Sequence, residues 1–200
     1  MRRSAAETRE HVLAVTHDLF YWNGIHAVGV DRVAAEAGVA PTTLYRLFRS
    51  KDDLVAAYVE RADENYRGWF GQAAKADGRS ARDRVLAVFD ELVAVVEPDR
   101  YRGCPFLMAL AEYPDPELAA HRGAVATKRW VRARFGELAA ELGAADPDAL
   151  ADQLALVLEG VYASVQALGV DGPARQARDL VEALLEGAAR PARRGAAARA

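Results

Sequence analysis

The sequence predicts an all-α protein of about nine helices, and three observations support this prediction. Hydrophobic residues make up 52% of the 200 residues, which is enough to fill one large core or two small ones. Alanine, the residue with the highest helix propensity, is abundant, and apolar residues recur at spacings of three and four rather than two. Glycine, proline and capping residues divide this pattern into segments of helix length.

Capping residues indicate where the helices begin and end. Ser4-Ala-Ala-Glu7 is a capping-box pattern, and Gly24 suits the end of the first helix. Pro41 fits the first position of the third helix, because its missing N–H needs no partner there. Ser50 is expected to cap the fourth helix. The expected helices span residues 4–24, 29–38, 41 onward, 50–76, 80–97, 105–112, 117–142, 146–169 and 174–188.

Composition and charge exclude several classes of protein. The net charge is −3, and residues 1–54 hold seven basic and seven acidic residues, so overall attraction gives no argument for nucleic-acid binding. The single cysteine, Cys104, cannot form an intrachain disulfide, which fits a reducing cytosol. Residues 1–10 lack the apolar segment of a signal peptide, and no run of eighteen apolar residues predicts a membrane span. We therefore expect a cytoplasmic protein.

The segment 33–51 contains the most informative pattern. It predicts two short helices joined by a tight turn at Gly38, and the second helix separates its side chains by chemistry. Its apolar face consists of Leu44, Leu47 and Phe48. Its polar face consists of Thr42, Arg46 and Arg49, and Thr43 and Tyr45 lie between the two faces. Residues 41–51 contain three basic residues and no acid. This arrangement suits a helix that enters the major groove of DNA, although a helical hairpin that only packs is the alternative.

Residues 28–54 resemble the DNA-binding signature of the TetR family of bacterial repressors. The matching elements are Val33-Ala34, Ala37-Gly38-Val39, Thr43-Leu44-Tyr45, and Phe48 followed by Ser50-Lys51 and Leu54. The resemblance covers about the first quarter of the chain strongly, and segments 102–106 and 112–116 are similar to parts of some members. The sequence departs from the pattern at Val28-Gly29, where hydroxyl residues are common, and at Ala40, where a capping serine is frequent.

The resemblance implies a ligand-responsive transcriptional repressor that binds a palindromic operator as a homodimer. It implies a helix-turn-helix DNA-binding domain over residues 1–54 and a helical ligand-binding and dimerisation domain over residues 55–189. Tyr45 and Lys51 match positions that bind phosphates. Thr42, Thr43 and Arg46 match positions that would contact base edges. No catalytic residue, cofactor or metal is implied. The residues at DNA-contacting positions are Thr42, Thr43, Tyr45, Arg46, Arg49 and Lys51.

Aromatic residues after position 55 are candidates for an apolar ligand pocket. As a set they exceed what we expect in so alanine-rich a domain, although each one could equally belong to the core. Glu112 and Gln166 could supply polar anchors for a small apolar or amphipathic ligand. The candidate ligand-binding residues are Tyr66, Phe70, Phe89, Phe106, Glu112, Trp130, Tyr162 and Gln166.

The last two expected helices each have apolar residues at spacings of three and four. These residues either fill the core of the subunit or, as the resemblance implies, form half of a four-helix dimer interface. Alanines along both helices would permit a close approach. The candidate interface residues are Leu150, Leu154, Val157, Val161, Val165, Leu180 and Leu184.

Several alternatives stay open at this point. A helical enzyme could use Glu112, His121 or Cys104, but the sequence lacks a phosphate-binding glycine loop, a nucleophile elbow and paired metal ligands. A TetR-type protein could also be an activator or could lack DNA binding. Cys104 could be a redox-sensitive thiol or a small buried side chain. Residues 190–200 hold four arginines and no acid, which predicts a disordered basic tail, either solvated or in contact with DNA.

Overall fold

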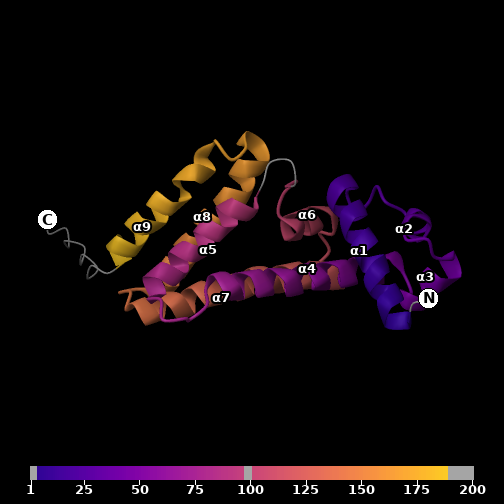
Figure 1. The fold of residues 1–200 in the computed structure, drawn as a ribbon, viewed down its shortest axis with the longest axis horizontal. Helices are drawn as coiled ribbons and strands as arrows, with labels where there is room; N and C mark the ends of the chain where they lie inside the picture. The colour runs from indigo at the N-terminus through magenta and orange to yellow at the C-terminus, as the bar shows by residue number, and fades with distance from the viewer. Residues whose placement is uncertain (1–3, 97–100, 189–200) are drawn as a thin grey trace, which may run out of the picture. The chain divides into compact units, whose positions relative to one another are not determined.

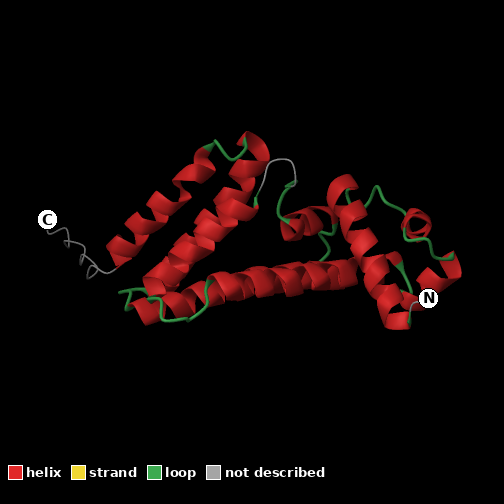
Figure 2. Cartoon of the chain, viewed as in Figure 1, coloured by secondary structure: helices red, strands yellow, loops and turns green. Residues whose placement is uncertain are grey.

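The computed structural model describes residues 4–96 and 101–188, and within these ranges all regular structure is helical (Figure 1; Figure 2). The helices are α1 (Ala5–Asn23), α2 (Val30–Glu36), α3 (Pro41–Leu47), α4 (Lys51–Ala73), α5 (Ala81–Val95), α6 (Pro105–Glu112), α7 (Ala119–Leu142), α8 (Pro147–Leu168) and α9 (Ala177–Ala188), with a 3₁₀ turn η1 (Pro173–Gln176) before α9. The predicted all-α fold is confirmed. The predicted basic tail, residues 190–200, lies outside the described residues. None of the described helices is both long and apolar enough to cross a membrane.

The helix ends follow the capping residues that the sequence indicates. Ser4 and Glu7 form the predicted capping box, since each side chain accepts a bond from the other's backbone N–H, at 3.2 and 2.7 Å. Gly24 ends α1 with a φ of 91°, a conformation that other residues rarely adopt. The Ser50 hydroxyl accepts a bond from the Asp53 N–H at 3.0 Å at the start of α4. These local signals therefore set the limits of α1 and the start of α4.

The contacts within the chain divide it into two compact units. Unit 1 consists of Met1–Trp69 and Arg102–Arg129, and unit 2 consists of Phe70–Tyr101 and Trp130–Ala200. The divisions fall inside α4 and inside α7, so each of these helices contributes to both units. The boundary that the sequence predicts near residue 54 therefore does not coincide with the division of the packing. The reason is that most of α4, all of α6 and the start of α7 pack in the same unit as α1 to α3.

Unit 1 is built around α1 and α4. In Figure 1, α1, α2 and α3 gather around the first turns of α4. Phe20 on α1 and Tyr58 on α4 meet edge to face, with 5.6 Å between ring centroids, and both are about 1% exposed. Val12 and Leu54 are fully buried in the same unit. This core fixes the base on which the two short helices α2 and α3 rest.

Unit 2 has an aromatic core and a buried arginine. The Phe135 ring lies 5.4 Å from Phe70 and 5.8 Å from Phe89, and all three rings are fully buried. The Arg84 guanidinium donates to the Ala74 carbonyl at 2.9 Å, just after the end of α4, and pairs with Glu141. Helix α9 packs on both α5 and α8. The burial of Arg84 is tolerated because its donors are satisfied at the otherwise open end of α4.

Tyr58 makes the stability of the protein sensitive to alkaline pH. Burial raises the pKa of Tyr58 above its ordinary value of 10.0. Above pH 10 this phenol ionises in the unfolded chain but stays neutral in the folded one, so the free energy of unfolding falls as pH rises. We expect urea denaturation to show a shallower fall for Tyr58→Phe than for the wild type, by up to about 1.4 kcal/mol per pH unit. Equal slopes for the two proteins would contradict this assignment.

Candidate nucleic-acid interface

Helices α2 and α3 form a helix-turn-helix whose turn is held to α1. Gly38 adopts a φ of 63°, which permits the tight turn between the two helices. His11 on α1 places Nε2 3.1 Å from the Ala37 carbonyl oxygen, so the turn is tied to the first helix. Gly29 and Ala40 begin the two helices without a side-chain capping bond. The two departures from the family pattern therefore leave both N-termini with open backbone donors.

The inner face of α3 is apolar and buried, as predicted from the spacing. Leu44 is 1% exposed and Phe48, directly after the helix, is 4% exposed. The Arg9 guanidinium lies over the Phe48 ring, 5.3 Å from its centroid, and covers it on the α1 side. Leu47 is half-buried. Two large apolar side chains therefore fix which face of this seven-residue helix points inward.

The outer face of α3 presents hydroxyl and cationic groups to solvent. Thr42, Arg46 and Arg49 are exposed, and Tyr45 is 48% exposed. Within the described part of the chain, neither arginine forms an ion pair. Thr43 and Lys51 are half-buried, and the Lys51 ammonium donates to the His26 carbonyl at 3.4 Å. Of the predicted DNA-contacting residues, Thr42, Tyr45, Arg46 and Arg49 are therefore exposed, and the two arginines can meet an anionic partner.

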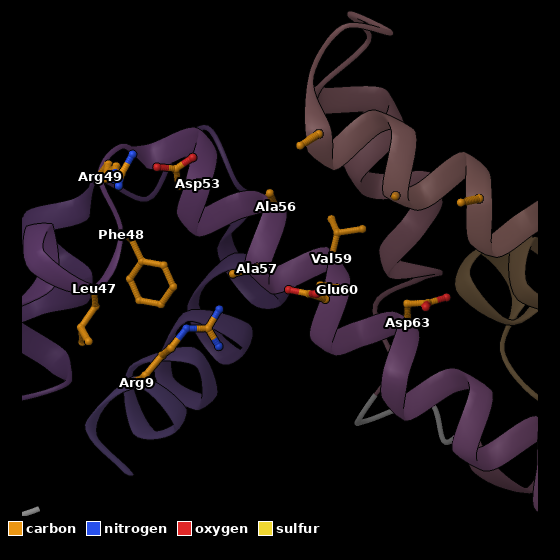
Figure 3. Close-up of a pocket in the computed structure, with 13 residues that line it drawn as sticks. Arg9, Leu47, Phe48, Arg49, Asp53, Ala56, Ala57, Val59, Glu60 and Asp63 are labelled. Atoms are coloured by element: carbon orange, nitrogen blue, oxygen red, sulfur yellow. The ribbon is translucent and has the colours of Figure 1, made fainter. Parts of the chain in front are cut away.

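A hollow of about 680 Å³ adjoins the end of α3 in unit 1 (Figure 3). Figure 3 shows Arg9 beside the Phe48 ring, with Val59, Glu60 and Asp63 farther along α4. The walls of this hollow carry both basic and acidic residues, so the hollow does not extend the cationic face of α3. The lining residues are Arg9, Leu47, Phe48, Arg49, Asp53, Ala56, Ala57, Val59, Glu60, Asp63, Ala119, Gly123 and Ala126.

Glu112, one of the two candidate ligand anchors, bonds to the turn after α1. Its two carboxylate oxygens accept bonds from the backbone N–H groups of Ile25 and His26, at 2.9 and 2.6 Å. The turn after α1 leaves these N–H groups without helical partners, and the carboxylate satisfies both. Gln166, the other proposed anchor, is exposed on α8.

The aromatic candidates for a pocket are divided between the units and pack against other rings. In unit 2, Phe70 contacts Trp130 at 5.4 Å between centroids, and Tyr162 is stacked on Tyr101 at 5.9 Å. In unit 1, Tyr66 meets Phe106 edge to face at 5.6 Å. For the fully buried Phe70 and Phe89 this packing favours the core alternative. The proposed ligand pocket therefore stays a prediction that this structure does not test.

Four of the seven candidate interface residues are buried within the single chain. Leu150, Leu154, Val161 and Val165 are at most 5% exposed in a single chain, because they face the core of unit 2. They therefore have almost no surface left for a partner to cover. Val157 and Leu184 are half-buried and Leu180 is 50% exposed. Leu156 on α8, which is absent from the candidate residues, is 73% exposed.

The residues proposed for an alternative enzyme are engaged in local structure. His121 places Nδ1 2.9 Å from the Tyr113 carbonyl oxygen, and Glu112 binds the turn after α1. Cys104 is 3% exposed, and its Sγ lies 3.2 Å from the Lys128 ammonium. Among residues 4–96 and 101–188, no three histidine, cysteine or acidic side chains are grouped as a metal site requires.

Comparisons with known proteins identify the family. A family profile described as "Bacterial regulatory proteins, tetR family" matches residues 12–58. The solved structure of a TetR-family transcriptional regulator from Streptomyces coelicolor is 33% identical and has a TM-score of 0.86, over 92% of this chain and 97% of that one. The chain belongs to the TetR family.

Other relatives support this assignment. A regulator from Streptomyces avermitilis is 33% identical with a TM-score of 0.80, covering 90% of this chain and 97% of its own. The HTH-type transcriptional regulator YjdC of Escherichia coli (strain K12) is 29% identical over 152 residues, which are 76% of this chain and 80% of YjdC. These relatives are transcriptional regulators rather than enzymes. The protein is therefore a DNA-binding transcriptional regulator of the helix-turn-helix type.

Two neighbouring residues on α3 separate its packing role from its surface role. We expect Leu44→Ala to lower the free energy of unfolding by about 2–5 kcal/mol, because it leaves a cavity under α3. Tyr45→Ala, on the exposed side, should change it by less than about 0.5 kcal/mol. Urea denaturation of both variants measures the difference. Similar losses of stability in the two variants would show that α3 is oriented differently.

Proposed function

We propose that this TetR-family regulator is a repressor that binds a palindromic operator as a homodimer. The observation that supports this most directly is the exposure of Thr42 and Arg46 on α3 while Leu44 and Phe48 are buried. A two-fold symmetric dimer would present two such helices on one side. Half-sites about 34–36 Å apart would then place both helices in successive major grooves on one face of the duplex.

The residues of the outer face divide into two proposed roles. Arg46 is suited to a bidentate contact with guanine, and the Thr42 and Thr43 methyl groups are suited to contact with a thymine methyl. Tyr45, Arg49 and Lys51 are proposed to bind phosphates and to fix the position of α3 on the duplex. Lys51 donates only one of its three ammonium protons to His26, so it keeps donors for a phosphate.

The proposed dimer uses the exposed apolar face of α8 and α9 in unit 2. Leu156 and Leu180 are 73% and 50% exposed, and a mostly apolar hollow of about 350 Å³ lies between them. Val157, Gly160 and Ala177 are among its lining residues. A second copy that covers this face would remove the exposed leucines from water. The proposed interface therefore keeps Val157 and Leu180 from the residues expected from the sequence and adds Leu156.

A small apolar or amphipathic ligand is proposed to release the repressor from DNA. The support for this step is the family to which the chain belongs. The ligand must bind one arrangement of the recognition helices better than the other, and couplings of about 1–3 kcal/mol are usual. Helix α4 contributes to both compact units, which makes it the proposed mechanical link.

Fluorescence anisotropy with labelled DNA tests the proposal. The probes are fragments from upstream of the protein's own gene and of its neighbours, with a scrambled duplex as control. Sequence-specific binding and increased reporter expression after deletion of the gene would support a repressor. Decreased reporter expression would indicate an activator, and the absence of specific binding to any fragment would contradict operator recognition.

Arg46 and Lys51 should affect DNA binding in different ways. We expect Arg46→Ala to weaken specific binding by about 1–3 kcal/mol and to relax the preference at one base pair. Lys51→Ala should weaken binding to all duplexes similarly and reduce the salt slope by about one, because one phosphate contact is lost. Titrations at several salt concentrations measure both effects. Unchanged operator affinity in both variants would show that another face contacts DNA.

The proposed dimer face predicts a change in oligomeric state. Leu180→Glu should shift the protein toward monomer, because it places a charge in an apolar interface. Leu107→Glu is a matched control, since Leu107 is also exposed, at 42%, but lies on α6 in unit 1. Light scattering after size-exclusion chromatography gives the mass of each variant. A dimeric Leu180→Glu protein would exclude this face as the interface.

A further inference from the structure

We propose that Glu112 and Tyr21 are positioning residues for DNA recognition, because they fasten both ends of α6 to the end of α1. We call the hydrogen bonds among Tyr21, Ile25, His26, Arg102, Gly103 and Glu112 the α6 latch. The inference rests on the operator binding proposed above. The proposed additional role of Glu112 and Tyr21 is to set the orientation of the helix-turn-helix. Glu112 lies more than sixty positions after α3 in the sequence.

The C-terminal end of α6 holds the turn between α1 and α2. The Glu112 carboxylate accepts from Ile25 and His26, and His26 Nε2 lies 2.6 Å from the Glu112 carbonyl oxygen. The His26 ring is stacked on Tyr113, with 5.1 Å between centroids and 9° between planes. A side chain at Gly24 would place its Cβ 3.4 Å from Glu112 Oε1. The turn therefore approaches Glu112 closely and bonds to it through main chain and side chain.

The N-terminal end of α6 is held by Tyr21, in the last turns of α1. The Tyr21 hydroxyl donates to the Gly103 carbonyl at 3.0 Å and accepts from the Arg102 N–H at 2.8 Å. The Arg102 guanidinium donates to the Tyr21 carbonyl at 2.6 Å. Burial raises the pKa of Tyr21, so its hydroxyl keeps the proton that it donates. Together the two ends of α6 hold the last turns of α1 and the turn that follows it.

The latched turn leads directly into the DNA-binding helices. Only three residues separate His26 from Val30, the first residue of α2. On its other side, the His26 carbonyl accepts from Lys51, the first residue of α4 and the residue proposed to bind a phosphate. The Glu112 carboxylate therefore holds the turn that leads into α2. A displaced turn would move the start of α2 and, with it, the orientation of α3.

The exposure of the latch at His26 points to positioning by Glu112 rather than to global stability. Its bonds at His26 are exposed to solvent, where hydrogen bonds and charges contribute little to the free energy of folding. Helices α2 and α3 have seven residues each, too few to hold a structure or an orientation alone. A loosened turn would lower the fraction of molecules in the DNA-competent arrangement, and the apparent Kd would rise in inverse proportion to that fraction.

The test compares Glu112→Gln with Glu117→Gln in the full-length protein, well below the melting temperature. The glutamine keeps the shape of Glu112, but its NH₂ group would face one of the two backbone N–H donors. Glu117 loses the same charge nearby, is exposed and has no bond to the turn. Two readouts are used: hydrogen exchange of residues 24–47, and affinity for operator and scrambled duplexes.

We expect Glu112→Gln to speed exchange across residues 24–47 and to weaken operator binding by about tenfold, with little change for scrambled DNA. Glu117→Gln should match the wild type in both readouts. A merely structural role would weaken binding to both duplexes equally, in proportion to the unfolded fraction, and would overturn the proposal. Unchanged or tighter operator binding in Glu112→Gln would also overturn it. If the wild type binds no operator, the proposed function fails. Unchanged hydrogen exchange of residues 24–47 in Glu112→Gln would separately refute the latch.

Discussion

The burial of Leu44 and Phe48 is the constraint on which the DNA-facing surface of this regulator depends. Helix α3 is too short to be stable in isolation, so its orientation comes from these two side chains and the core beneath them. Once they point inward, the helical period places Thr42 and Arg46 outward. The Arg9 guanidinium of α1 lies over the Phe48 ring. The exposure of the DNA-facing side of α3 therefore depends on the burial of its apolar side.

Most of the fold could be predicted from the sequence because its signals are local. The Ser4 capping box, Gly24, Pro41 and Ser50 each act within a few residues, and each marks a helix end in the structure. The two faces of α3 follow from spacing within one helix. Local signals do not show how the packing divides, because contacts between distant segments place residues 102–129 in the unit of α1.

The candidate sites were harder to predict than the helices, for a physical reason. Periodicity shows that α8 has an apolar face but not what that face meets, so it could not decide between core and interface for Leu150 and Leu154, which are buried within the single chain. The useful signal was the extra leucine, Leu156, on the other side of α8. Glu112 bonds to residues 86 and 87 positions away, a relation that no pattern in the sequence reveals. The sequence alone therefore could not show that this carboxylate bonds to the turn after α1.

Methylation interference on the operator tests the central claim most directly. Dimethyl sulfate marks guanine N7 in the major groove and adenine N3 in the minor groove, so the pattern of interference shows which groove the protein enters. If the buried back of α3 presents Arg46 to the major groove, methylated guanines in two half-sites should block binding, and Arg46→Ala should lose this sensitivity at one guanine of each half-site. Interference confined to adenine N3, or insensitive to Arg46, would contradict the account.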